Sequence, residues 1–174
     1  MKLEGKRIAI LAENMYQEME LWVPYYRMKE EGAEVSIVGT GGAKSYTSKH
    51  GYPVTVDVQA DQVDAVEYDA VIIPGGFAPD LMRRSPAMVA LVREAFGQGK
   101  VVAAICHAGW MSVSAGILKG KRATSFFCIK DDLVNAGATW VDQEVVVDGN
   151  LITARKPDDL PAFCREIVKA LQKR

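Results

Sequence analysis

Short apolar runs alternate with helical sequence along most of this chain, and no other feature limits its fold as strongly. The apolar runs span residues 7–12, 34–38, 69–73 and 101–105, and the segments with apolar residues at helical spacing span 19–31, 88–96, 107–116 and 160–171. Continuous apolar runs of this length are typical of parallel strands that are covered on both faces. The alternation therefore predicts a single α/β domain over residues 1–174, with a doubly wound, mostly parallel sheet and helices on both faces.

Two segments interrupt this alternation. Residues 39–57 are largely polar up to the turn sequence Gly51-Tyr52-Pro53, which predicts an antiparallel excursion at the edge of the sheet. Residues 145–147 and 151–154 flank the turn sequence Asp148-Gly149-Asn150, and this pattern predicts a β-hairpin.

The composition is that of an ordinary globular protein and excludes several classes. The chain has 174 residues, of which 49% are hydrophobic and 25% charged, and its 21 Lys and Arg against 22 Asp and Glu leave a net charge of −1. This balance provides no field that attracts nucleic acid or anionic membranes. No apolar run approaches the ~20 residues of a membrane span, and the N-terminus predicts a core strand rather than a signal peptide. We therefore expect a cytoplasmic protein without nucleic-acid or membrane partners.

The chain contains three cysteines, Cys106, Cys128 and Cys164, and no CxxC pair. An odd number at wide spacing argues against a disulfide framework and against a zinc site, so neither a metal nor another cofactor is expected. Cys164 lies on the apolar side of the last helical segment, and Cys128 stands between Phe127 and Ile129. Both are best interpreted as small buried hydrophobes.

Cys106 differs from the other two cysteines because of its place in the chain. It directly follows the apolar run 101–105 and precedes a helical segment, which is the layout of a nucleophile elbow. Such a turn needs small residues two positions before and two after the nucleophile, and Ala104 and Ala108 meet this requirement. Amides at a helix N-terminus favour a thiolate, so we expect a lowered pKa and a nucleophilic sulfur.

His107 is the candidate base beside this cysteine. Consecutive residues at a helix start do not face each other, so the sequence alone does not assure a Cys106–His107 pair. The other histidine, His50, lies in the polar excursion, where a solvated loop residue is the simpler interpretation. The acids that could assist follow two of the strand ends: Glu13, Glu18, Glu20 and Asp80.

Several segments together resemble the PfpI/ThiJ superfamily, and within it the PfpI-type intracellular proteases and protein deglycases. The resemblance covers nearly the whole chain. The segments that carry it are 103–107, Pro74-Gly75-Gly76 with Ala78-Pro79-Asp80, Glu20 with Pro24, 158–160, 50–52 and 130–137. Two departures, at Gln17 and at Ala108-Gly109-Trp110, alter the expected wall of the pocket.

This resemblance implies a flavodoxin-like fold, similar to that of class I glutamine amidotransferases, and a role for each site residue. Cys106 would be the nucleophile, and Glu20 would hydrogen-bond its sulfur. His107 would be the triad histidine, oriented by Asp80 of a neighbouring subunit, so a homodimer or hexamer with a composite active site is expected.

The resemblance also implies that backbone groups at Gly75, Gly76 and His107 bind the oxyanion or the substrate.

Two functions of different class follow from these residues. The first is a cysteine hydrolase that acts on carbonyl centres, either as a peptidase or as a deglycase/glyoxalase that removes methylglyoxal-type adducts. Its substrates would be peptides, glycated proteins or small aldehydes, and the small domain favours small electrophiles over long peptides. The second is a redox-sensing stress protein in which Cys106 is oxidised beside Glu20 without turnover. A sensor does not need His107 and Asp80, so the sequence favours the hydrolase.

Overall fold

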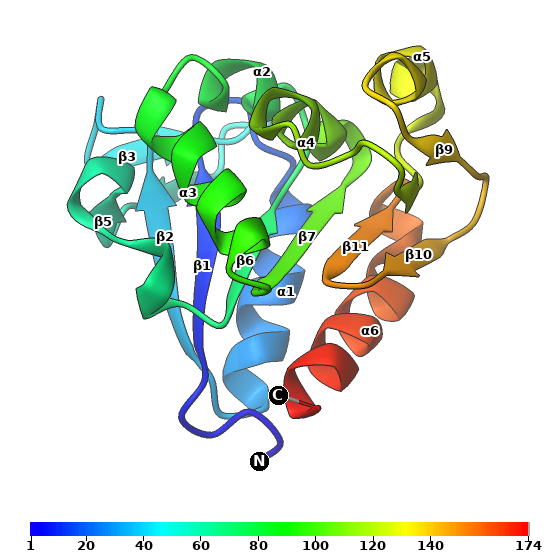
Figure 1. Ribbon diagram of the computed structural model, residues 1–174. Coiled ribbons are helices and arrows are strands. Elements are labelled where there is room, and N and C mark those ends of the chain that lie inside the picture. Colours follow the sequence, from blue (N-terminus) through cyan, green and yellow to red (C-terminus); the bar gives the residue numbers. More distant parts are fainter. Residues whose placement is uncertain (174) are drawn as a thin grey trace.

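The apolar runs of the sequence become the central strands of one sheet in the computed structural model, which describes residues 1–173 (Figure 1). The strands of this sheet are β1 (Arg7–Ala12), β2 (Glu34–Gly39), β5 (Val58–Gln59), β6 (Ala70–Ile73), β7 (Val101–Ile105), β10 (Val145–Asp148) and β11 (Leu151–Ala154). Within the described residues their order across the sheet is β10-β11-β7-β6-β1-β2-β5.

Neighbouring strands in this sheet run parallel, except for β10 and β11, which form the predicted antiparallel hairpin. The register places Ile10 beside Ile37 on one side and Ile72 on the other. Without the two edge strands, the order β2-β1-β6-β7-β11 is the flavodoxin-like order 2-1-3-4-5. The predicted doubly wound α/β fold is therefore confirmed.

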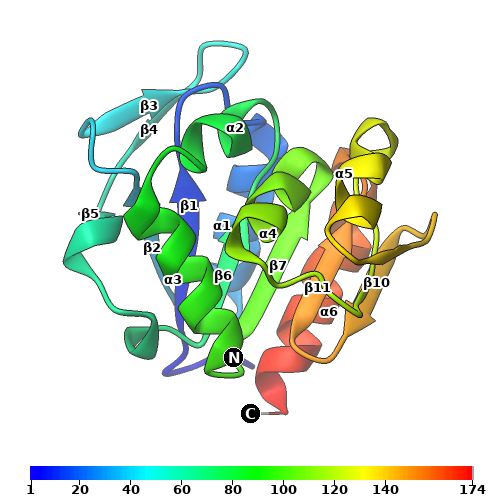
Figure 2. The same cartoon turned by 45° about the horizontal axis from the view of Figure 1, so that its top comes forward.

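Helices cover both faces of the sheet. Figure 1 shows α1 (Glu18–Glu30) and α6 (Leu160–Gln172) behind it and α3 (Pro86–Gly97) and α4 (Gly109–Ala115) in front, and Figure 2 shows the same layers from a second direction. The short helices α2 (Ala78–Met82) and α5 (Lys130–Asn135) contact α4. Single turns of 3-10 helix occupy 60–62, 65–67, 106–108, 127–129 and 157–159. Every residue of β6, β7 and β11 is buried between the two helical layers, which is why these strands are apolar throughout.

The polar excursion forms a small sheet of its own. Its strands β3 (Ser45–Thr47) and β4 (Pro53–Thr55) pair antiparallel as predicted, but the edge of the main sheet is β5. Backbone hydrogen bonds join the excursion to the loop after β1: Met15 N–H donates to Thr47 O (2.8 Å) and Lys49 N–H donates to Tyr16 O (3.0 Å). The excursion is therefore held near the carboxyl ends of the strands.

A further pair of strands, β8 (Arg122–Ala123) and β9 (Thr139–Trp140), runs parallel in a separate sheet. The sequence did not predict it, because two-residue strands leave no periodic pattern. Across residues 1–173, no helix combines the length and the apolar character that crossing a membrane requires.

Candidate active site

The loops that follow β1 and β6 are hydrogen-bonded to each other at the point where the strand order reverses. Gln17 N–H donates to Gly75 O (3.2 Å), Phe77 N–H donates to Met15 O (2.9 Å), and Tyr16 and Gly76 form an isolated bridge. Ligands bind at such switch points in open α/β sheets. The loops after β1 and β6 therefore form one side of the candidate site.

Cys106 stands on the predicted nucleophile elbow. The chain leaves β7 and turns directly into a 3-10 helix at Cys106–Ala108, and Cys106 has a φ of 61°. A non-glycine residue in this left-handed region stores strain that the surrounding structure must hold, and such residues gather at active sites. Ala104 and Ala108 are buried on either side, as the elbow requires.

Gly75 and Gly76 allow the loop after β6 to approach the elbow. A Cβ on Gly75 would lie 2.5 Å from Glu20 Oε2 and 2.8 Å from Cys106 Cβ. Gly76 has a φ of 76°, and its Cβ would lie 2.7 Å from Gln17 N. Only glycine fits this close approach at both positions.

Gly76→Ala is therefore expected to lower the free energy of unfolding by roughly 3 kcal/mol or more, because the new methyl group collides with backbone and adds strain at positive φ. Urea unfolding followed by circular dichroism measures the change. Gly97→Ala is the matched control: Gly97 is the last residue of α3 and has no atom within 4 Å of its Cβ position. We expect this control to be as stable as the unaltered protein, and equal losses in both variants would contradict the argument.

Glu20 approaches the elbow from the first turn of α1. Gln17 caps this helix by accepting a hydrogen bond from Glu20 N–H (2.9 Å). The Glu20 side chain is fully buried, and its Oε2 accepts a hydrogen bond from Gly75 N–H (2.7 Å). Burial raises the pKa of Glu20 to about 7, although its hydrogen bonds with Gly75 and Cys106 oppose the rise. A neutral Glu20 carboxyl at the elbow is therefore available near pH 7.

The Cys106 sulfur faces Glu20 on one side and two backbone amides on the other. Burial and the negative charge of an ionised Glu20 raise the pKa of Cys106 to about 12, while amide hydrogen bonds from His107 and Gly76 oppose the rise. This direction is opposite to the lowering that a helix start predicts. The physical reason is that the 3-10 turn and the seven-residue α4 give a weak dipole, whereas the carboxyl is buried against the thiol. A thiolate at this position therefore depends on stabilisation by the neighbouring groups.

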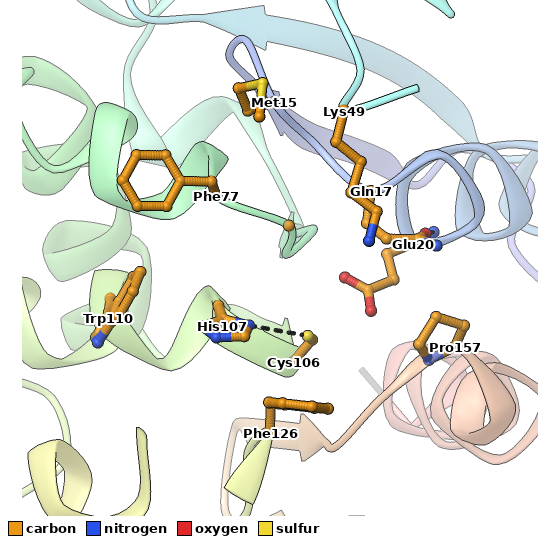
Figure 3. A pocket seen from close by; sticks show the side chains of 11 residues that line it. Met15, Gln17, Glu20, Lys49, Phe77, Cys106, His107, Trp110, Phe126 and Pro157 are labelled. Carbon is orange, nitrogen blue, oxygen red and sulfur yellow. Dashed lines mark hydrogen bonds between the residues drawn. The ribbon is translucent and has the colours of Figure 1, made fainter. Parts of the chain in front are cut away.

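His107 lies against this sulfur. Its Nδ1 is 3.2 Å from Cys106 Sγ, so the structure forms the pair that the sequence could not assure (Figure 3). Phe126 stacks on the imidazole at 5.1 Å between ring centroids, and Trp110 meets it edge to face at the same distance. Burial, with the nearby charge of Lys49, lowers the pKa of His107. The ring is therefore neutral at pH 7 and able to accept a proton.

The structure places two predicted site residues, Gly75 and Asp80, and one predicted core residue, Cys128, differently from the expectation. Gly75 was expected to bind oxyanion or substrate, but its N–H already donates to Glu20, so this glycine positions the carboxyl instead. Cys128 was expected to be buried, but it is exposed and its Sγ lies 3.2 Å from His107 Nε2. Asp80 lies in the first turn of α2, and its Oδ2 is 3.6 Å from Arg84 Nη2. Within this chain Asp80 does not line the pocket, so its role across an interface stays a prediction.

The predictions for Cys164 and His50 agree with the structure. Cys164 is buried in α6, and His50 is an exposed loop residue whose Nδ1 lies 3.0 Å from Glu18 Oε2. Among residues 1–173, no group of three or more His, Cys, Asp and Glu side chains is placed to hold a metal ion.

These groups open into a cavity of about 320 Å³, a volume suited to a small ligand. Its lining residues are Met15, Gln17, Glu20, Lys49, Gly76, Phe77, Cys106, His107, Trp110, Phe126 and Pro157 (Figure 3). Sequence reasoning missed Lys49, which the excursion brings to the rim of the pocket. Its position depends on a backbone hydrogen bond to Tyr16, and no local pattern signals such a contact.

Comparisons with protein families, with curated proteins and with solved structures all find the same family. The model of the DJ-1/PfpI family matches residues 6–170. The chain is 46% identical over 166 residues to the Deglycase PfpI of Pyrococcus furiosus, covering 95% of this chain and 99% of the relative. It is 39% identical over 169 residues to the protein/nucleic acid deglycase 2 of Escherichia coli, covering 96% and 98%. A solved two-domain protein of Anabaena variabilis, with DJ-1/ThiJ/PfpI-like and ferritin-like domains, matches 95% of this chain and 48% of its own length, with 43% identity and a TM-score of 0.93.

Proposed function

This chain belongs to the DJ-1/PfpI family, and from that premise we propose that it is a cysteine-dependent hydrolase that acts on carbonyl centres, with removal of methylglyoxal-type adducts from proteins as its main activity. One observation carries the proposal: Cys106 stands on a strained elbow inside the pocket and faces both Glu20 and His107 Nδ1. A buried structural cysteine needs neither contact. The names of the relatives from Pyrococcus furiosus and Escherichia coli, both deglycases, support this choice of reaction.

The first step of the proposed reaction is proton transfer within the pair. The proton of the Cys106 thiol moves to Nδ1 of the neutral His107, and the sulfur attacks the former aldehyde carbon of the adduct, which carries the amine. The C–N bond breaks, and the amine leaves with the proton from His107 Nδ1. A protonated Glu20 donates a hydrogen bond to the sulfur and so stabilises its negative charge before the attack. Its pKa of about 7 keeps a large fraction of Glu20 protonated at neutral pH.

A proton then moves from the sulfur-bearing carbon to the neighbouring carbonyl carbon, which oxidises the first carbon to a thioester and reduces the second to an alcohol, so no outside oxidant is needed. The amides of Gly76 and His107 are directed at the Cys106 sulfur, and an oxygen bonded to the attacked carbon would lie close enough to accept from them. Water attacks the thioester carbon, the negative charge passes to that oxygen, and the hydroxy acid leaves as the Cys106 thiol is restored.

The shape of the pocket favours a small or local electrophile over a long peptide. A cavity of about 320 Å³ between Phe126, Trp110 and Phe77 accommodates a three-carbon adduct together with the side chain that carries it. Lys49 provides a positive charge at the rim. This charge suits the carboxylate that forms when such an adduct is released as a hydroxy acid.

The test is a parallel incubation of the protein with methylglyoxal, with a methylglyoxal-modified peptide and with a casein-type substrate. The proposal expects release of hydroxy acid and recovery of the free peptide, at rates well above cleavage of casein. Cleavage of casein alone would replace the deglycase with a peptidase. Absence of turnover with all three substrates, together with ready oxidation of Cys106, would replace it with a redox sensor.

Glu20→Leu is expected to reduce kcat/KM by about a hundredfold, because leucine can neither donate to the Cys106 sulfur nor accept from Gly75. Glu13→Leu and Glu18→Leu serve as controls from the same loop and helix. Glu13 accepts a hydrogen bond from Thr40 and Glu18 accepts one from Ser48, so neither is tied to the elbow. Similar losses in all three variants would remove Glu20 from the mechanism.

A further inference from the structure

Both ring nitrogens of His107 are occupied by sulfur atoms of this same chain. Nδ1 lies 3.2 Å from Cys106 Sγ, and Nε2 lies 3.2 Å from Cys128 Sγ. A neutral imidazole carries one N–H, so one nitrogen donates while the other accepts. The identity of the group at Nε2 therefore decides which nitrogen is free to act as a base toward Cys106.

We infer that Cys128 is the positioning residue of the active site: its sulfur accepts the Nε2–H of His107 and so leaves the Nδ1 lone pair free for the Cys106 proton. The inference rests on the function proposed above and gives this chain a Cys106–His107–Cys128 relay. Its proton balance is simple. The Cys106 S–H bond breaks, an Nδ1–H bond forms, and the Nε2–H bond stays intact throughout the transfer. No oxidant, reductant or further acid takes part.

The position of Cys128 is fixed by the elbow itself. Cys128 lies in the 3-10 turn Phe127–Ile129, and that turn is anchored by Phe126, whose N–H donates to Cys106 O (3.1 Å). The ring of the same Phe126 stacks on His107. Ile129 N–H closes the turn by donating to Phe126 O (3.2 Å). The peptide group that carries the nucleophile therefore also holds the segment that presents the second sulfur.

The charged groups around His107 do not offer a better partner for Nε2. Lys49 lines the same pocket but is a cation and disfavours the imidazolium. Glu20 faces Cys106 and Gly75. On the side of Trp110, Asp132 accepts a hydrogen bond from the indole Nε1–H (2.9 Å), so that carboxylate is engaged.

Asp80 of a neighbouring copy is the competing candidate for the group at Nε2. The two assignments predict opposite results. If Cys128 accepts Nε2–H, Cys128→Ala alters the tautomer of His107, whereas Asp80→Ala leaves the tautomer in place. If Asp80 of another copy accepts Nε2–H, Asp80→Ala alters the tautomer and Cys128→Ala leaves it in place.

The decisive experiment is ¹⁵N NMR of the imidazole side chains, which distinguishes the Nε2–H tautomer from the Nδ1–H tautomer. The chain has only two histidines, so His50 provides an internal reference in every spectrum. We expect the Nε2–H tautomer for His107 in the unaltered protein and in Cys128→Ser, whose hydroxyl can also accept. In Cys128→Ala we expect a mixture of tautomers, a His107 titration at lower pH, and a fall in kcat/KM of about tenfold. Cys128→Ser should stay within about threefold of the unaltered protein.

Cys164→Ala is the control for loss of a thiol, because Cys164 is buried in α6 and does not line the pocket. It should leave the His107 signals in place. The inference fails if Cys128→Ala retains the tautomer and titration of the unaltered protein, or if Cys128→Ser behaves like Cys128→Ala. The NMR measurement needs no substrate, so a protein that shows the Nε2–H tautomer but turns over nothing would overturn the proposed function and leave the inference standing.

Discussion

Cys106→Ala protein is expected to lose at least about a thousandfold in kcat/KM toward every carbonyl substrate that the unaltered protein turns over. The substitution removes the sulfur that faces Glu20, His107 and the amide of Gly76 at once. Alanine is smaller than cysteine and is the residue type that the elbow already tolerates two positions away on each side. The loss would therefore come from the missing nucleophile rather than from a collapsed pocket.

The measurement is steady-state turnover of the methylglyoxal-modified peptide, with the melting temperature of each variant recorded beside it. Cys164→Ala is again the matched control, since it deletes a thiol that is buried in α6 (3% exposed). This control should keep activity within about twofold of the unaltered protein. If Cys106→Ala retained more than a tenth of the activity at an unchanged melting temperature, another group would have to be the nucleophile.

The sheet could be predicted from sequence because its central strands are buried on both faces. Burial of this kind demands apolar residues at every position, and β6, β7 and β11 obey it without exception. The elbow was predictable for a similar local reason. The tight turn around Cys106 requires small residues on both sides, and Ala104 and Ala108 are visible there in the sequence.

The parts of the site that the sequence did not predict depend on contacts between distant segments. Lys49 reaches the pocket through a backbone hydrogen bond to Tyr16, and Cys128 reaches His107 because Phe126 is anchored on Cys106 O. The apolar neighbours of Cys128 suggested burial, yet the 3-10 turn exposes this side chain. Neither contact has a spacing or a periodicity that a pattern could reveal.

The pKa of Cys106 also depends on a contact between distant segments, so the sequence alone did not predict its direction. Sequence position places the thiol at a helix start, which favours the thiolate. The fold places the thiol beside the buried Glu20, and burial together with that carboxylate outweighs the helix start. Because the two groups interact strongly, the charge at the elbow depends on which of them holds the proton. Glu20 is therefore the residue whose titration is most informative.

Glu20→Gln is expected to change how the stability of the protein depends on pH. Burial raises the pKa of Glu20 from 4.5 to about 7 in the folded state. Between these values the folded protein binds more protons at this side chain than the unfolded chain does, so the free energy of unfolding falls as pH rises. The stabilising contribution is fully present below pH 4.5 and is lost as pH rises through 7. At about 1.4 kcal/mol per pH unit, the total loss is about 3 kcal/mol.

Glutamine is the neutral counterpart with the same shape. Its side-chain oxygen can accept the hydrogen bond that Gly75 N–H donates to Glu20 (2.7 Å), and it never ionises. The free energy of unfolding of Glu20→Gln, relative to that of the unaltered protein, should therefore rise by about 3 kcal/mol between pH 4 and pH 8. Urea unfolding at a series of pH values measures this difference. The same rise should persist in a Cys106→Ala background, because burial is the largest cause of the shift.

Glu18→Gln is a control from the same turn of α1, and its stability is expected to depend on pH in the opposite direction. Burial alone would raise the pKa of Glu18, but hydrogen bonds with Ser48 and His50 outweigh it and lower the pKa to about 2. Its contribution to stability is present above pH 4.5 and is lost as pH falls toward 2, so Glu18→Gln should be less stable than the unaltered protein at pH 7 and equal to it near pH 2. A Glu20→Gln curve that runs parallel to that of the unaltered protein from pH 4 to pH 8 would mean that folding does not raise the pKa of Glu20 and that Glu20 is ionised at pH 7. An ionised Glu20 has no proton to donate to the Cys106 sulfur, and activation of the nucleophile would then depend on His107 alone.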